Sequence, residues 1–124
     1  MKRKILLVDD EASLLELMKL NLEATGKYEV QVESRGLKAV DRAKAFKPDL
    51  IFLDIVMPDI EGSEVAYLLK EDPALSKVPI IFLTATVTAD EVERMGQKIG
   101  GQIFLAKPAS LKQLVECIEK AVRE

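Results

Sequence analysis

Histidine and tryptophan are absent from this 124-residue sequence, and it contains a single cysteine, Cys117. One cysteine cannot form an intramolecular disulfide bond. Without histidine, the usual zinc sites and the usual pairs of nucleophile and base are mostly excluded as well. Any bound metal is therefore expected to be a hard cation held by oxygen ligands.

A long apolar run is also missing. Four basic or neutral residues open the chain, and only residues 5–8 are continuously apolar before two aspartates follow. This run is too short for a signal peptide or a membrane span, so we expect a cytoplasmic protein without membrane association. The net charge is −3, whereas phosphate contacts need clustered Lys and Arg, so direct binding of nucleic acid is not expected.

The glycines are few and their spacing excludes the common nucleotide-binding loops. They stand at positions 26, 36, 62, 96, 100 and 101, which gives neither G-x-G-x-x-G nor G-x-x-x-x-G-K-[ST]. The sequence therefore contains no nucleotide fingerprint.

Short apolar runs alternate with helical patterns along the whole chain. Runs at 5–8, 50–53, 80–83 and 103–106 are typical of strands buried on both faces, whereas the alternating residues 28–33 predict a strand at the sheet edge. Helical periodicity appears at 14–22, 37–43, 65–69, 92–99 and 111–122, and Ser110 with Gln113 forms a capping box before the last helix. The pattern predicts one domain over residues 1–124, with a doubly wound parallel α/β sheet.

Polar residues follow the strands at the edge where open parallel sheets bind ligands. Asp9, Asp10 and Glu11 follow the run 5–8, and Asp54 follows the run 50–53; Thr84 and Lys107 follow the runs 80–83 and 103–106. Two carboxylates 4 Å apart repel by about 4 kcal/mol at an effective dielectric constant near 20. Lys107 and a divalent cation, Mg²⁺ or Mn²⁺, are the natural compensating charges, and Mg²⁺ points to phosphoryl chemistry.

These residues carry a resemblance to a known family. The chain resembles the receiver domain of bacterial two-component response regulators over essentially its whole length. The matching motifs, on successive strand ends, are Val8-Asp9-Asp10-Glu11, Asp54-Ile55-Val56-Met57-Pro58 with Gly62, Leu83-Thr84-Ala85 and Lys107-Pro108. The resemblance implies a flavodoxin-like fold with five parallel strands in the order 2-1-3-4-5 and five helices.

By the same resemblance, Asp54 accepts a phosphoryl group. Asp9, Asp10, Asp54 and the backbone carbonyl of Val56 would hold Mg²⁺, for which Mn²⁺ can substitute. Thr84 and Lys107 would bind the phosphoryl oxygens. Such a domain is a signalling module that catalyses only its own phosphorylation and dephosphorylation.

The resemblance further implies a cis peptide between Lys107 and Pro108 and a switch at two residues. Thr84 would move toward the new charge, and Phe104 would fill the space that it vacates. The face formed by the fourth helix, fifth strand and fifth helix would change shape to control a protein target. Val56 and Thr86 stand at positions that tune hydrolysis in the family, and neither supplies a carboxylate or amide to orient water, which predicts a long-lived phosphoryl group.

The implied partners are a sensor histidine kinase or a phosphotransfer protein, because this chain has no histidine to serve as donor. The downstream protein target is unknown. We expect a free-standing receiver that is a monomer or a weak phosphorylation-dependent dimer.

Three other functions compete with this interpretation. A phosphohydrolase that forms an aspartyl phosphate typically has a second Asp two residues after the nucleophile, where this chain has Val56. An interaction module that has lost the chemistry usually lacks an acidic residue or the lysine, and both are present. A flavodoxin-like redox protein needs a Ser/Thr/Gly-rich phosphate nest after the first strand, which is absent.

Overall fold

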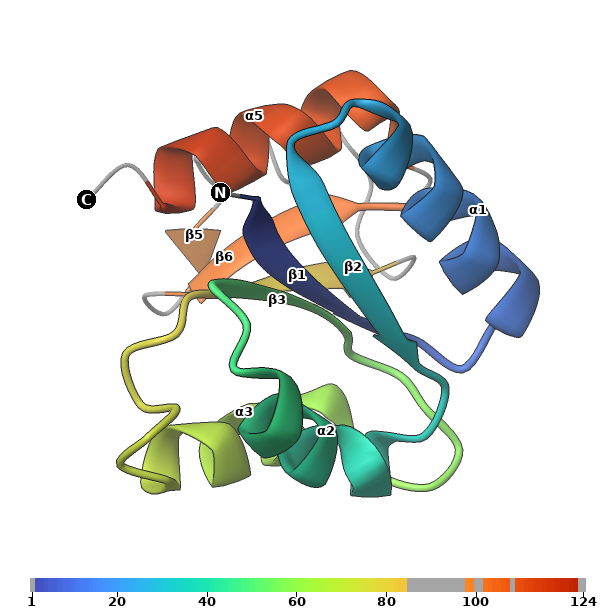
Figure 1. Ribbon diagram of the computed structural model, residues 1–124. Helices are drawn as coiled ribbons and strands as arrows, with labels where there is room; N and C mark the ends of the chain where they lie inside the picture. The colour runs from blue at the N-terminus through green and yellow to red at the C-terminus, as the bar shows by residue number, and fades with distance from the viewer. Residues whose placement is uncertain (1, 85–97, 100–101, 108, 123–124) are drawn as a thin grey trace.

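The computed structural model describes residues 2–84, 98–99, 102–107 and 109–122, and it places one mostly parallel sheet between two helical layers (Figure 1). The strands are β1 (Arg3–Val8), β2 (Tyr28–Glu33), β3 (Leu50–Asp54), β4 (Ile80–Thr84), β5 (Lys98–Ile99) and β6 (Gln102–Ala106). The helices are α1 (Ala12–Ala24), the short 3₁₀ helix η1 (Gly36–Lys38), α2 (Ala39–Phe46), α3 (Gly62–Glu71) and α5 (Leu111–Ala121).

The strands are ordered β2-β1-β3-β4-β6-β5, and every neighbouring pair is parallel except β5 with β6. The five predicted strands correspond to β1, β2, β3, β4 and β6, so the predicted order 2-1-3-4-5 is confirmed. The alternating segment 28–33 forms the edge strand β2, as expected. The two-residue strand β5 is an addition that the sequence pattern did not predict.

Both faces of the sheet are buried, which explains the continuous apolar runs. Successive side chains of a strand point to opposite faces. Ile5 and Leu7 therefore pack in the cluster under α1 and α5, whereas Leu6 and Val8 pack in the cluster with α2 and α3 (Figure 1). All four side chains are buried. A run of apolar residues without alternation is what a strand between two helical layers requires.

The capping box predicted before the last helix is confirmed. Ser110 Oγ accepts the Gln113 backbone N–H at 3.1 Å, and Gln113 Oε1 accepts the Ser110 N–H at 2.9 Å. These two bonds satisfy N–H groups that a helix start leaves without intrahelical partners. They fix the point at which the chain leaves the sheet and enters α5.

Two helix predictions need correction. The second helix was expected to begin at Leu37 with that side chain inside; instead, Leu37 lies in η1 and is 66% exposed. A 3₁₀ turn has three residues per turn instead of 3.6, so Gly36 and Ala39 face the core in its place. The predicted fourth helix, 92–99, lies mostly outside the described residues, and its last positions, Lys98–Ile99, pair with β6 as strand β5 instead.

The edge strand is less exposed than expected at its carboxyl end. The alternation of apolar and polar residues over 28–33 places Glu33 on the more polar face of the strand, yet its side chain is buried. Its carboxylate accepts the Arg35 backbone N–H at 3.0 Å and pairs with Arg42 Nε at 3.3 Å. These partners compensate for the lost hydration of the charge, and they tie the end of β2 to α2.

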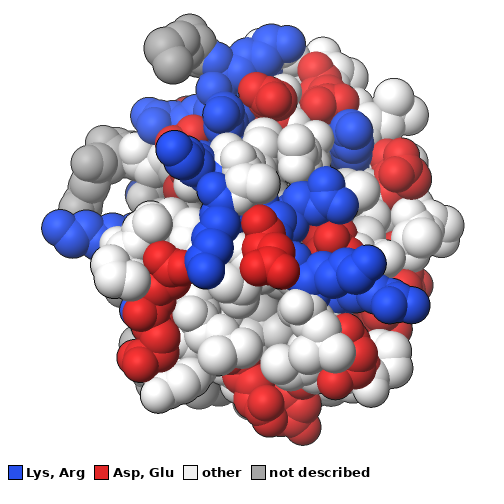
Figure 2. All heavy atoms as spheres, turned by 60° about the horizontal axis from the view of Figure 1, so that its bottom comes forward, with Lys and Arg blue, Asp and Glu red and all other residues white. Residues whose placement is uncertain are grey.

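The outer surface over α2 and α3 carries charges of both signs. Figure 2 shows this side of the molecule, where Lys and Arg side chains are interleaved with Asp and Glu. The face visible there therefore presents no broad field of one sign. In the described ranges, no helix combines the length and the apolar character needed to cross a bilayer.

Candidate functional site

The carboxyl ends of β1, β3 and β6 bring three charged side chains together. Val8 of β1 lies in register with Leu53 of β3, so Asp9 and Asp54 follow at neighbouring positions of the sheet edge. Asp9 comes two residues after Leu7, and Asp54 two residues after Phe52, and both of these apolar residues pack under α1 and α5. The period of two in a strand therefore places both carboxylates on the same side of the sheet.

Lys107 is the cation at the centre of this cluster. Its Nζ lies 2.5 Å from Asp9 Oδ2, 3.5 Å from Asp54 Oδ1 and 3.8 Å from Glu11 Oε1. Only 12% of the Lys107 side chain is exposed. The other oxygen of Asp9, Oδ1, accepts the Glu11 backbone N–H at 3.0 Å. The buried Asp9 carboxylate therefore has a partner at each oxygen.

The pKa values of Asp54 and Lys107 are both raised in a site where negative charges are crowded together. Burial and then the neighbouring charge of Asp9 raise the pKa of Asp54 to about 6; Lys107 opposes the shift, and a hydrogen bond and the charge of Asp10 add to it. Burial alone would lower the pKa of Lys107, but its hydrogen bond to Asp9 and the charges of Asp9, Asp54 and Glu11 outweigh burial and raise it. One lysine thus leaves the carboxylates only partly compensated.

The three aspartates have the composition and spacing of a site for a hard divalent cation. One oxygen each from Asp9, Asp10 and Asp54 lies within 4.8 Å of the others. Asp10 is exposed while Asp9 and Asp54 are buried, so the cluster is open to solvent on one side. Carboxylate oxygens with room for water match the preference of Mg²⁺. The residues present therefore fit Mg²⁺.

The loop that follows Asp54 is held tightly at its end. Gly62, the first residue of α3, donates its N–H to the carbonyl of Ile55 at 2.7 Å. A Cβ atom at Gly62 would collide with the backbone carbonyl of Asp54. The glycine therefore permits a close approach that holds α3 against the end of β3. Val56 lies in this loop with its side chain 61% exposed.

Two of the remaining predicted residues lie on β4 and β6, the next strands after β3 in the sheet. Thr84 ends β4 and is 1% exposed, and its backbone carbonyl accepts the Lys107 N–H at 2.8 Å. Phe104 of β6 is half-buried and stacks on Phe82 of β4, with ring centroids 5.2 Å apart. Pro108 and Thr86 lie outside the described residues, so the cis peptide and the role of Thr86 stay predictions.

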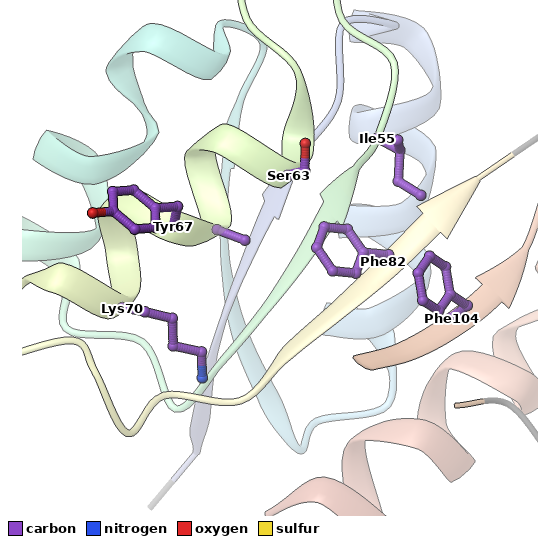
Figure 3. Close-up of a pocket in the computed structure, with 7 residues that line it drawn as sticks. Ile55, Ser63, Tyr67, Lys70, Phe82 and Phe104 are labelled. Carbon is purple, nitrogen blue, oxygen red and sulfur yellow. The ribbon is translucent and has the colours of Figure 1, made fainter. Parts of the chain in front are cut away.

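A groove of about 500 Å³ opens beside these two aromatic rings (Figure 3). It lies between α3 and the strands β4 and β6, next to the residue that follows Asp54. Its lining is formed by Ile55, Ser63, Ala66, Tyr67, Lys70, Phe82 and Phe104. Phe104 thus has open space on one side, as a side chain that changes position requires.

Sequence reasoning missed two contributors to this region. Glu11 was counted among the strand-end carboxylates without a role, but it shares Lys107 with Asp9 and Asp54. Asp59 was not considered, yet its carboxylate accepts two backbone N–H groups from η1, more than twenty residues away in the sequence. A contact between segments so far apart in the sequence leaves no periodic pattern from which it could be predicted. The only available signal was the position of Asp59 directly after Pro58, because an Asp there often stabilises a turn with its side chain.

Comparison with known proteins agrees with this geometry. Residues 5–119 match the family described as response regulator receiver domain. The polar-differentiation response regulator DivK of Brucella anthropi is 34% identical over 119 residues, which cover 96% of this chain and 95% of that protein. The chemotaxis protein CheY4 of Vibrio cholerae superposes with a TM-score of 0.82 at 26% identity, over 98% of this chain and 99% of that one.

A crystal structure from Chloroflexus aurantiacus J-10-fl superposes with a TM-score of 0.83 at 27% identity and covers both chains completely. Similarity over nearly full length, in sequence and in backbone, excludes a chance match at a few strand ends. The chain belongs to the response regulator receiver domain family, the phospho-accepting signalling module of two-component systems.

Proposed function

We propose that Asp54 is the phospho-acceptor and that residues 1–124 form one receiver domain around it. The convergence of Asp54 with Asp9, Asp10 and Lys107 at one sheet edge carries this proposal. A carboxylate oxygen of Asp54 attacks the phosphorus of a phosphohistidine. The P–N bond breaks, its electron pair stays on the imidazole nitrogen, and an aspartyl phosphate forms. Because this chain has no histidine, the donor is another protein, a sensor histidine kinase or a phosphotransfer protein.

Asp9, Asp10, Asp54 and the backbone carbonyl of Val56 would hold Mg²⁺. The three carboxylates supply oxygen ligands within reach of one ion, and Mn²⁺ accepts the same ligands. A bound divalent cation neutralises charge that develops on the phosphoryl oxygens. Burial and the neighbouring charge of Asp9 raise the pKa of Asp54 despite Lys107, and a bound cation would offset this crowding of negative charge, which supports the assignment.

Thr84 and Lys107 would bind the phosphoryl oxygens that the metal leaves free. The ammonium of Lys107 already lies 3.5 Å from Asp54, and a charge-assisted hydrogen bond to an anionic oxygen is stronger than a neutral one. Movement of Thr84 toward the phosphoryl group, with Phe104 following, would then switch the surface that a target protein binds. Phosphorylation shifts the populations of two conformations when it binds one of them better.

The intact mass of the protein after incubation with Mg²⁺ and acetyl phosphate tests the acceptor. We expect one phosphoryl group on the native chain, none on Asp54→Asn and none when EDTA removes the metal. Asp72→Asn is the matched control, because Asp72 lies at the far end of α3 and should leave phosphorylation unchanged. If no adduct forms and no phosphate is released, the chain is an interaction module without the chemistry, and the proposal is wrong.

A further inference from the structure

The β3–α3 loop, which carries Val56, is fastened to the start of the second helix by Asp59. Asp59 Oδ2 accepts the Leu37 backbone N–H at 3.0 Å, and Oδ1 accepts the Gly36 N–H at 3.3 Å. These bonds, led by the one from Leu37, hold the pKa of Asp59 below its ordinary value. The loop is therefore joined to η1 by a carboxylate that stays ionised at neutral pH.

Packing at Gly36 reinforces this connection. A Cβ atom at Gly36 would collide with Ile60 Cγ2 and would lie 3.1 Å from Met57 Cε. Met57 is itself buried in the core beside α2 and α3. Two residues of the loop thus press against the glycine whose N–H Asp59 binds, so the loop lies against η1 without a gap.

The turn that receives Asp59 is fixed from the other side as well. Glu33, at the end of β2, accepts the Arg35 N–H at 3.0 Å, so three consecutive N–H groups of this turn bind two carboxylates. The carbonyl of Glu33 accepts the Asp9 N–H at 3.2 Å. The Asp59 contact therefore connects the loop after Asp54 to a turn that is itself anchored beside Asp9.

We propose that Asp59 is a positioning residue that sets the affinity of the site for Mg²⁺. It would do so by holding the loop that carries the Val56 carbonyl in one conformation. A carbonyl ligand on a mobile loop must be ordered when the metal binds, and the entropy of that ordering weakens binding. This inference rests on the proposed function, because it takes the Val56 carbonyl as a ligand.

The competing explanation is that Asp59 only stabilises η1 and has no effect on Mg²⁺ binding. A matched control at Asp72 distinguishes this explanation from the positioning role. Asp72 Oδ1 accepts the Ala74 N–H at 2.9 Å, and its Oδ2 pairs with Lys44 at 3.3 Å. Asp72 is thus another loop aspartate that accepts a backbone N–H, at the end of α3 away from the site. Asp59→Ala and Asp72→Ala both remove such a bond, but only the first one loosens the loop at the metal.

The test is a Mg²⁺ titration followed by the backbone amide signals in NMR, together with urea unfolding of each variant. We expect Asp59→Ala to raise the Mg²⁺ dissociation constant roughly tenfold, as loss of a ligand-orienting contact does. Asp72→Ala should stay within about twofold of the native value at a similar loss of stability. Asp59→Asn should lie between, since an amide oxygen accepts one N–H but lacks the second acceptor, and it also serves if Asp59→Ala does not fold.

Phosphorylation provides a second readout. At saturating Mg²⁺, Asp59→Ala should regain the native rate of labelling by acetyl phosphate, because its defect is in metal affinity. Equal Mg²⁺ dissociation constants for Asp59→Ala and Asp72→Ala overturn the positioning role while leaving the proposed function intact. If the native chain shows no saturable Mg²⁺ binding, the proposed metal site itself is wrong.

Discussion

The ammonium of Lys107 lies closer to Asp9 than to Asp54, at 2.5 Å against 3.5 Å. The cation that is proposed to bind the phosphoryl group thus has a buried partner before any phosphoryl group arrives. Asp9 therefore has the closer cationic partner, and Asp54 is the less compensated carboxylate. Burial of Asp54 and then the neighbouring charge of Asp9 raise its pKa to about 6, and Lys107 offsets only part of this shift.

Lys107→Met should therefore destabilise the metal-free protein strongly. Removing one partner of a buried ion pair leaves the other charge buried alone, which costs about 3 kcal/mol in unfolding free energy. Urea unfolding at pH 7 measures the loss, and Mg²⁺ should recover part of it by supplying positive charge. Lys44→Met is the matched control: its pair with Asp72 is at the surface, so the loss should stay below about 1 kcal/mol. Equal losses would show that Lys107 is not the main compensating charge.

Because the pKa of Asp54 is raised, we predict that the free energy of unfolding decreases as pH rises. An unfolded Asp has its ordinary pKa of about 4, whereas the pKa of folded Asp54 is about 6. Between these values the folded state binds more protons than the unfolded state, so the free energy of unfolding decreases as pH rises through this window. The loss of stability caused by ionised Asp54 is complete above about pH 6, and it disappears below about pH 4.

Asp54→Asn should accordingly stabilise the metal-free protein at pH 7 and leave it unchanged at pH 4. Allowing for screening by solvent, we expect a gain on the order of 1 kcal/mol at pH 7. Thermal unfolding in EDTA across this pH range measures it. Asp72→Asn should instead lower the stability of the protein at neutral pH, because a hydrogen bond from the Ala74 N–H lowers the pKa of Asp72 and so favours its ionised form in the folded state. An Asp54→Asn variant less stable than the native chain at pH 7 would contradict the assigned shift.

Val56 provides a kinetic prediction. Its side chain is exposed beside the site and carries no group that orients water, so the phosphoryl group should be long-lived. Val56→Asn introduces an amide there and should change the rate of decay severalfold. The loss of phosphorylated mass after removal of acetyl phosphate measures this rate. Leu20→Asn, which places an amide on exposed α1 away from the loop, should leave the decay unchanged; an unchanged rate in Val56→Asn would refute a role for this position.

The strands and the strand-end residues were predictable because their signals are local. Leu7 and Phe52 sit in short apolar runs, and the polar residues two positions later mark where each strand ends. The burial of Glu33 was not predictable in the same way, because it depends on Arg42, which comes from another element. Asp59 likewise acts through N–H groups that lie far away in the sequence. Amphipathic patterns report which face is buried, but they do not report which charge finds which partner.

The contact between Gly62 and the backbone of Asp54 yields the last prediction. Gly62→Ala places a Cβ against the Asp54 carbonyl, which is backbone and cannot rotate away, so β3 and α3 must separate. We expect a loss of stability of about 2 kcal/mol, in the range for overpacking, and loss of phosphorylation by acetyl phosphate.

Gly26→Ala separates this steric effect from the general cost of replacing a glycine. Gly26 has a φ of 78°, but a Cβ there meets no atom within 4 Å. Its replacement should cost about 1 kcal/mol, because a left-handed backbone is unfavourable for alanine, and phosphorylation should proceed at the native rate. Urea unfolding and intact mass measure both variants. If Gly62→Ala is phosphorylated as fast as Gly26→Ala, the close packing of α3 on β3 does not position Asp54, because the acceptor then tolerates displacement of its own backbone.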